Sequence, residues 1–175
     1  MGEEKFFLEK DRIPVFIGVA GSKKRELEKK FNAKINVNSA NGEVNIVCED
    51  SVSIFILSNI IAAINYGHSP EHAVKLEDEN YVLDVIDLKH MVKDHERLKS
   101  VAGRIIGKDG STRRAIEEIT KCNISVKDSF VSSVGPYENI QLIHEALEML
   151  IKGASHKSFY SYLERNKSSE ASGLL

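Results

Sequence analysis

An order of predicted elements that occurs twice constrains this chain more than any other feature. Gly18-Val19-Ala20-Gly21 follows an apolar run at residues 12–17, which predicts a strand, and precedes a predicted helix at residues 22–31. Gly107-Lys108-Asp109-Gly110 precedes a similar helix at residues 111–120. In each half two short strands and a long apolar helix come next. Because the two glycine motifs start 89 residues apart, at positions 18 and 107, the pattern predicts two small domains of one topology.

Strand signals support this division. Asn41-Gly42 separates two alternating apolar stretches, which predicts a hairpin. In the second half, residues 81–88 predict a strand, residues 94–106 a helix, and residues 124–126 and 131–134 two short strands. The long helices are predicted at residues 51–66 and 136–153, where Gly67 and Gly153 end them, and residues 154–165 suit a further short helix. Ser22 and Ser111 are the expected N-caps of the helices that follow the glycine motifs. Together these elements predict an α+β fold.

Length and composition exclude several classes of protein. The chain has 175 residues, of which 42% are hydrophobic and 29% charged, as in an ordinary globular protein. Its longest apolar stretch, residues 52–64, is shorter than the ~20 residues that a membrane span needs. The N-terminus lacks the basic and apolar regions of a secretory signal. The chain is therefore expected to be cytoplasmic and without a membrane contact.

Metal and cofactor motifs are missing from the sequence. Cys48 and Cys122 are the only cysteines, so no zinc pattern or disulfide framework is present, and both are expected to be buried free thiols. His68 and His72 have no third candidate ligand nearby. We therefore expect no metal site and no cofactor.

The charge is unevenly distributed along the chain. Residues 97–127 hold eight basic and three acidic residues, a net charge of +5, whereas residues 68–96 hold three basic and eight acidic residues, a net charge of −5. A basic island in a chain of net charge −2 is typical of a local contact with a polyanion. The alternative is a solvated helix face.

The second glycine motif lies inside that basic island. Two glycines that bracket two residues let the backbone approach a sugar-phosphate chain closely, and the helix that follows presents free N–H groups. Lys108 adds a phosphate partner, and Arg104, Arg113 and Arg114 flank it. A Walker A motif is excluded because Ala102 and Asp109 stand at its Gly and Ser/Thr positions. The motif therefore predicts a clamp for an oligonucleotide.

No carboxylate pair predicts catalysis. Asp84 with Asp87 and Glu117 with Glu118 are the candidates, and neighbours on a helix point apart. The nucleophile elbow G-x-S-x-G does not occur. The chain is therefore not expected to be an enzyme.

Residues Val101–Glu118, with Gly103-Arg104-Ile105-Ile106-Gly107-Lys108-Asp109-Gly110 at their centre, resemble the signature of a type I K-homology (KH) domain. Further segments, at residues 68–73, 81–88, 148–154 and 160–165, are similar to the archaeal two-KH ribosome-assembly proteins. These proteins are relatives of the eukaryotic partner-of-Nob-one family, also called the Dim-two family. The similarity covers about residues 11–165.

This resemblance implies a fold and a set of domains. It implies two tandem type I KH domains, each a three-stranded antiparallel sheet packed on one face by helices. The expected bounds are 9–67 for the first domain, 68–79 for an acidic linker, 80–152 for the second domain, 153–165 for a helical extension and 166–175 for a flexible tail.

The resemblance also implies a function. We expect single-stranded RNA binding in small ribosomal subunit assembly and rRNA 3′-end maturation, at the 3′ region of small-subunit rRNA. A Nob-type endonuclease and the alpha subunit of translation initiation factor two are the implied protein partners. A KH-type translational regulator that binds mRNA and a protein-interaction scaffold are the alternatives.

The second domain is expected to carry most of the RNA contacts. The expected RNA-binding residues are Arg104, Ile105, Ile106, Gly107, Lys108, Asp109, Gly110, Arg113, Arg114 and Ile124. The first motif departs from the family pattern because Val19 and Ala20 offer no charge to a phosphate. Lys23, Lys24 and Arg25 follow it and either compensate or form a solvated helix face.

Overall fold

A computed structural model describes residues 2–171 of the chain. The chain divides into two compact units between Asp78 and Glu79. The first unit contains, in chain order, β1 (Gly2–Phe7), α1 (Ile13–Ile17), η1 (Val19–Gly21), α2 (Ser22–Lys30), β2 (Lys34–Val37), β3 (Glu43–Cys48), α3 (Ser51–Asn65), α4 (Pro70–Ala73) and η2 (Val74–Glu77). Elements labelled η are 3₁₀ helices.

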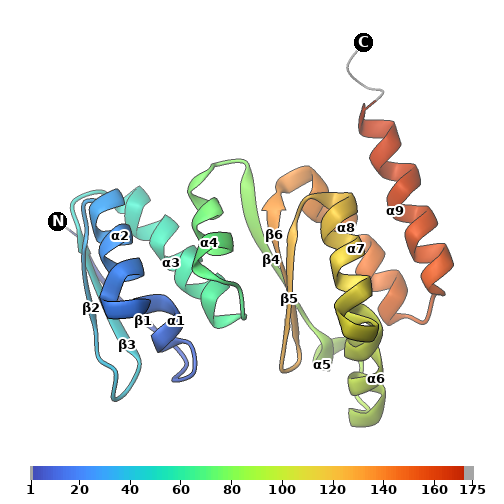
Figure 1. Cartoon of the computed structure of the whole chain (residues 1–175), viewed down its shortest axis with the longest axis horizontal. Coiled ribbons are helices and arrows are strands. Elements are labelled where there is room, and N and C mark those ends of the chain that lie inside the picture. The colour runs from blue at the N-terminus through green and yellow to red at the C-terminus, as the bar shows by residue number, and fades with distance from the viewer. Residues whose placement is uncertain (1, 172–175) are drawn as a thin grey trace. The chain divides into compact units, whose positions relative to one another are not determined.

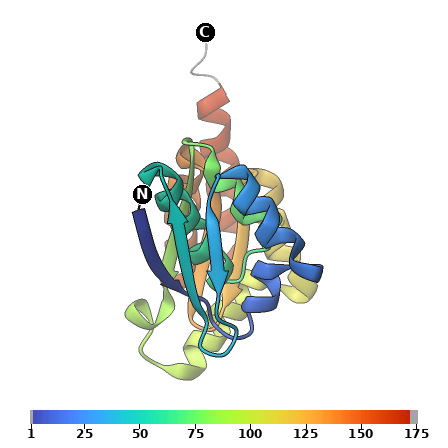
Figure 2. The same ribbon diagram turned by 90° about the vertical axis from the view of Figure 1, so that its left-hand side faces the viewer.

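The sheet of the first unit has the strand order β1-β3-β2, with β3 in the centre and both pairs antiparallel (Figure 2). Val44 and Ile46 of β3 are fully buried and alternate with the half-buried Glu43, Asn45 and Val47. Ile35 of β2, opposite Ile46, is also fully buried. Leu57 of α3 and Phe16 of α1 are fully buried as well. The sequence alternation therefore sets which face of the sheet the helices cover.

The expected strand at residues 12–17 is wrong, because these residues form the helix α1. Pro14 stands in its first turn, where a proline costs no hydrogen bond, and Ile13 and Phe16, three residues apart, are its buried residues. A short apolar run fits a strand and a buried helix equally well, which explains the error. The first strand of this unit is β1, which lies before the expected domain start at residue 9.

The second unit repeats the corrected order (Figure 1). It contains β4 (Tyr81–Asp87), α5 (Leu88–Met91), α6 (His95–Ile106), η3 (Lys108–Gly110), α7 (Ser111–Thr120), β5 (Asn123–Lys127), β6 (Phe130–Pro136), α8 (Tyr137–Ile151) and α9 (His156–Ala171). Its sheet is antiparallel in the order β4-β6-β5. The α+β fold class, with two three-stranded antiparallel sheets, is confirmed.

A single cluster of apolar side chains forms the core of the second unit. Ile105 of α6 and Ile116 of α7 are fully buried, and Ile143 and Leu150 of α8 complete the layer over the sheet. Phe159 from α9 is also fully buried in this cluster. The C-terminal helix is therefore an integral part of the unit.

The expected linker and the expected C-terminal extension both contain helices. The stretch expected as an acidic linker, residues 68–79, contains α4 and η2, and Ala73 and Leu76 in it are buried. Helix α9 continues past residue 165 to Ala171. The last part of the expected tail, residues 172–175, lies outside the described residues.

Both cysteines, Cys48 and Cys122, are buried free thiols, as the sequence predicts. None of the helices within residues 2–171 is long and apolar enough to span a membrane. The same residues contain no group of three or more His, Cys, Asp and Glu side chains placed to hold a metal ion.

Candidate nucleic-acid interface

The two glycine loops have the same backbone conformation. Gly18 and Gly107 have φ/ψ angles of 73°/174° and 74°/172°. Gly21 and Gly110 share one left-handed conformation, with φ of 77° and ψ of 16°. The residues before these second glycines also have positive φ, 50° in the first loop and 51° in the second. The chain therefore builds one loop geometry twice.

Local packing explains why Gly107 is a glycine. Its amide hydrogen-bonds to the Gly103 carbonyl at 2.8 Å and ends α6, and its positive φ suits a residue without a Cβ. A Cβ at this position would collide with the backbone and side chain of Thr112. The loop therefore turns tightly over the first turn of α7.

The N-caps differ from the predicted ones. Gly21 and Gly110 are the N-cap residues of α2 and α7, and neither supplies a side-chain cap. Ser22 and Ser111 are already the first helical residues. The Ser22 and Ser111 amides donate to the Val19 and Lys108 carbonyls. No N-cap side chain covers the amides that follow, and the positive end of the helix dipole lies at the loop. This arrangement suits a phosphate group.

The charged residues of the second loop point to solvent. Lys108 and Asp109 are exposed, and Arg114 is exposed on α7. The Arg114 guanidinium donates a 2.7 Å hydrogen bond to the Asp109 carbonyl and so connects α7 to the loop. Arg113 is half-buried, with a buried Nε that has no hydrogen-bond partner among the described residues. Of the predicted basic residues, Lys108 and Arg114 thus remain open to an oligonucleotide.

The apolar residues predicted to contact RNA separate into two groups. Ile105 is fully buried and Ile124 is 3% exposed, so both side chains belong to the core. Ile106 is 37% exposed beside the loop. Ile106 is therefore the apolar side chain that a base could contact directly.

Arg104 braces the loop from behind. Its guanidinium donates to the Leu150 carbonyl at 2.9 Å and to the Ala154 carbonyl, both at the end of α8. The His156 ring of α9 lies 3.0 Å from the Arg104 carbonyl. These contacts tie the last turn of α6 to the turn between α8 and α9. Because two carbonyls engage the guanidinium, the structure gives Arg104 a positioning role next to Gly107.

Neither this brace nor the packing of Thr112 is predicted from the sequence. Thr112 is 5% exposed and fills the space beneath Gly107. Ala154 and His156 take part through a carbonyl and a ring nitrogen, some fifty positions from Arg104. A local motif carries no signal for such contacts.

The basic residues after the first loop are engaged in contacts within their own unit. The Lys23 ammonium lies 2.9 Å from a Glu71 carboxylate oxygen. The Lys24 ammonium contacts Glu28 at 2.8 Å and the Ile35 carbonyl at 2.9 Å. Of the three candidates for compensation, Arg25 is the one with an exposed side chain. The positive charge at the first loop is therefore largely neutralised.

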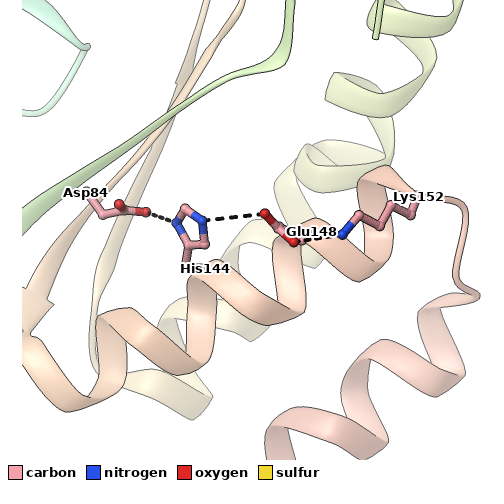
Figure 3. Close-up of polar contacts among 4 residues, drawn as sticks. All are labelled: Asp84, His144, Glu148 and Lys152. Carbon is pink, nitrogen blue, oxygen red and sulfur yellow. Dashed lines mark hydrogen bonds and ion pairs between the residues drawn. The ribbon is translucent and has the colours of Figure 1, made fainter. Parts of the chain in front are cut away.

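The candidate carboxylate pairs serve the fold. Asp87 caps α5 by accepting from the Lys89 amide at 3.0 Å, and Glu117 accepts from the Ile124 amide at 2.9 Å. Asp84 of β4 contacts His144 of α8 at 2.7 Å (Figure 3).

Figure 3 also shows that this contact continues along α8. The Nε2 of His144 lies 3.7 Å from Glu148, which pairs with Lys152 at 2.8 Å. Because both ring nitrogens of His144 face carboxylates, the imidazole is oriented as a link between strand and helix, without a nitrogen directed at a substrate.

Comparison with known proteins shows which proteins share this architecture. A family model described as "Eukaryotic type KH-domain (KH-domain type I)" matches residues 82–168. A KH domain-containing protein of Methanocaldococcus jannaschii is 39% identical over 162 residues, which cover 90% of this chain and 71% of that protein. The RNA-binding protein pno-1 of Caenorhabditis elegans is 32% identical over 126 residues, 69% of this chain and 44% of that protein. This chain thus spans less than half of the nematode relative.

A solved structure shows the same fold over nearly the whole length. The crystal structure of the a/eIF2alpha–aDim2p–rRNA complex from Pyrococcus horikoshii OT3 contains a chain with a TM-score of 0.87 and 38% identity. The match covers 96% of this chain and 95% of that chain.

Proposed function

Because this chain belongs to the PNO1/Dim2 family of KH-domain proteins, we propose that it binds single-stranded RNA in the assembly of the small ribosomal subunit. Relatives are named as RNA-binding proteins, and one solved relative is complexed with rRNA. The role is one of binding and positioning without catalysis.

One observation carries this proposal: Lys108 stands exposed in a glycine loop at the start of α7. The loop brings the sugar-phosphate chain close to the backbone, the amides of α7 donate to a phosphate, and Lys108 supplies charge. Segment 97–127, which contributes α6, η3, α7 and β5, adds a net charge of +5. The first loop has the same backbone with Val19 and Ala20 in place of charged residues. The second unit therefore supplies most of the electrostatic affinity.

The same site favours unstacked bases of a single strand. Ile106 offers an apolar contact next to the loop, and RNA is recognised in sequence mainly where its bases are free of a duplex. Aromatic platforms are scarce near the loop, so base edges and aliphatic contact carry recognition. The predicted residues of the second loop, Gly107 to Gly110, together with Ile106 and Arg114, form the proposed contact surface.

The proposed target is the 3′ region of small-subunit rRNA, at the stage when the 3′ end of the precursor matures. The alpha subunit of translation initiation factor two is the proposed protein partner, supported by the Pyrococcus complex. A Nob-type endonuclease is a second proposed partner, which rests on the family resemblance alone.

A binding experiment tests the target. The full chain is titrated with a single-stranded oligonucleotide from the 3′ end of small-subunit rRNA and with a scrambled oligonucleotide of equal length, at several salt concentrations. We expect tighter binding of the native sequence and a linear fall of log affinity with log salt. Equal affinities would indicate a generic RNA binder, and crosslinking with sequencing of the bound RNA would then identify an mRNA target. Failure of both oligonucleotides to bind would favour the scaffold alternative.

A further inference from the structure

The long helices of the two units, α3 and α8, are followed by the same backbone turn. Gly67 after α3 and Gly153 after α8 both have positive φ. The hydroxyl of Ser69 accepts a hydrogen bond from the amide three residues later, at 3.3 Å, and the hydroxyl of Ser155 does the same at 3.1 Å. Positions in the two units therefore correspond one to one here, with an offset of 86 residues between positions 69 and 155.

Aromatic rings fill the space beyond this turn in the second unit. Phe159 is fully buried, and Tyr160 packs against the core with its ring edge-to-face to Phe159 at a centroid distance of 5.4 Å. The ring of His156 stacks on Tyr160 at 6.3 Å. These rings cover the helix pair formed by α7 and α8.

The corresponding positions of the first unit carry small side chains. Ala73 stands where the second unit has Phe159, and Val74 stands where it has Tyr160. A pocket of about 170 Å³ lies here, lined by residues of α2, α3, α4 and η2. Its apolar lining comes from Leu27, Ile60, Pro70 and Val74. The first unit thus has a preformed apolar pocket beside Val74, the residue that corresponds to Tyr160 of the second unit.

Three charged side chains of α2 and α4 surround the pocket: Lys23, Glu26 and Glu71. The Lys23 ammonium lies 2.9 Å from Glu71 and 3.6 Å from Glu26. The hydrogen bond to Glu71 raises the pKa of Lys23, and the same contact lowers the pKa of Glu71. With one ammonium and two carboxylates, the rim has a formal net charge of −1.

We propose that this pocket is a docking site for a partner protein, which inserts one aromatic side chain flanked by a lysine or arginine. We expect an aromatic occupant because Tyr160 corresponds to Val74 in the second unit. We expect a flanking cation because the acidic rim attracts positive charge and repels the phosphates of RNA. Because Lys23 is held in this rim, it serves the pocket and not the first glycine loop.

Short peptides test the pocket on the full chain. The probes are acetylated, amidated heptapeptides with Lys-Phe-Lys, Lys-Ala-Lys or Glu-Phe-Glu at the centre and glycines on both sides, added to protein with labelled methyl groups. We expect the Lys-Phe-Lys peptide to shift the methyl signals of Leu27, Ile60 and Val74 in a saturable manner. The other two peptides should bind at least five-fold more weakly.

Val74→Tyr is the most direct test of the pocket, because it gives the first unit the residue that the second unit has at the corresponding position, Tyr160. We expect it to reduce binding of the Lys-Phe-Lys peptide at least five-fold while RNA affinity stays unchanged. The dispersed methyl signals of the first unit, compared with those of the native chain, show whether the variant is folded. Should Val74→Tyr fail to fold, the double variant Glu26→Lys with Glu71→Lys tests the rim with two exposed residues and should reverse the preference between the Lys-Phe-Lys and Glu-Phe-Glu peptides.

Three results would overturn the proposal. One is the absence of saturable shifts with the Lys-Phe-Lys peptide, and another is equal binding of the phenylalanine and alanine peptides. The third is a shift of the same methyl signals by single-stranded RNA in place of the peptide, which would make the occupant a nucleobase.

Discussion

The two glycine loops share a backbone and differ in the side chains that they present. In the second loop Lys108 is exposed, and Arg114 of α7 donates a hydrogen bond to the Asp109 carbonyl. In the first loop Val19 is 89% exposed, and the ammonium groups of Lys23 and Lys24 are paired with carboxylates. Loop geometry and charge are therefore separable. The fold builds the loop geometry, and local ion pairs decide how much of the positive charge is available to a ligand.

An arginine stands behind the loop in both units. In the second unit Arg104 of α6 donates to the Leu150 and Ala154 carbonyls, and in the first unit Arg12, just before α1, donates to the corresponding Ile64 and His68 carbonyls at 2.7 and 2.8 Å. The second unit adds the His156 ring of α9 on the Arg104 carbonyl, where the first unit has Pro70.

The largest expected effect comes from reversing the charge of the second loop. Lys108→Asp places two neighbouring carboxylates at the phosphate position, so RNA affinity should fall at least tenfold, or about 1.4 kcal/mol. Val19→Asp is the matched change in the first loop and should cost clearly less. Titration of the full chain with the 3′-end oligonucleotide measures both, and equal losses would break the distinction between the two loops.

Removal of the brace should have the next largest effect. Arg104→Ala leaves two carbonyls without their donor and loosens the loop, so affinity should fall roughly five-fold, about 1 kcal/mol. Because Arg104 positions the loop without contacting phosphate, the slope of log affinity against log salt should stay as in the native chain. A slope reduced by about 0.7 would instead show that Arg104 contacts a phosphate.

A third test concerns the glutamate that links a helix to the following strand in each unit, from α2 to β2 and from α7 to β5. Glu28 accepts from the Ile35 amide at 2.9 Å, as Glu117 does from Ile124. Burial by itself would raise the pKa of Glu28, but the hydrogen bonds from Lys24 and the Ile35 amide outweigh it and lower this pKa below 4.5. The contribution of Glu28 to stability is therefore complete above pH 4.5 and is lost as the pH falls through its lowered folded-state pKa.

Glu28→Gln should accordingly destabilise the first unit by about 1 kcal/mol at pH 7 and by less in acid. Denaturant unfolding followed at signals of each unit, at pH 7 and at pH 3, measures this difference. A cost that is independent of pH would mean that shape alone, and not the ionised carboxylate, holds the contact.

The smallest expected effect is a gain at the first loop. Val19→Lys adds to the first loop the charge that Lys108 gives the second, on an unchanged backbone. RNA affinity should rise two- to three-fold, about 0.5 kcal/mol, and the salt slope should steepen by about 0.7. Val52→Lys, at an exposed valine of α3, is the matched control for added charge. If both variants raise the affinity equally, the first loop is not a site of phosphate contact.

Local residue patterns are sufficient to predict the repeat, the fold class and the position of the second loop. Period-2 alternation marks β3 and the apolar stripes mark α3, α7 and α8, because burial of one face is a local property of the side-chain pattern. Glycine spacing and charge clustering located the loop for the same reason. The short apolar run at residues 12–17 was misread because a helix and a strand bury such a run equally well.

The tertiary structure alone decided which predicted residues are free to act. Arg104, Lys23 and Lys24 look alike in the sequence, but each is held by a carbonyl or carboxylate from a distant segment. Ile105 and Ile106 are neighbours, yet one lies in the core and the other beside the loop. The pocket of the first unit depends on Val74 standing where the second unit has Tyr160. Such differences arise from contacts between segments far apart in the chain, and a local pattern of residues contains no record of them.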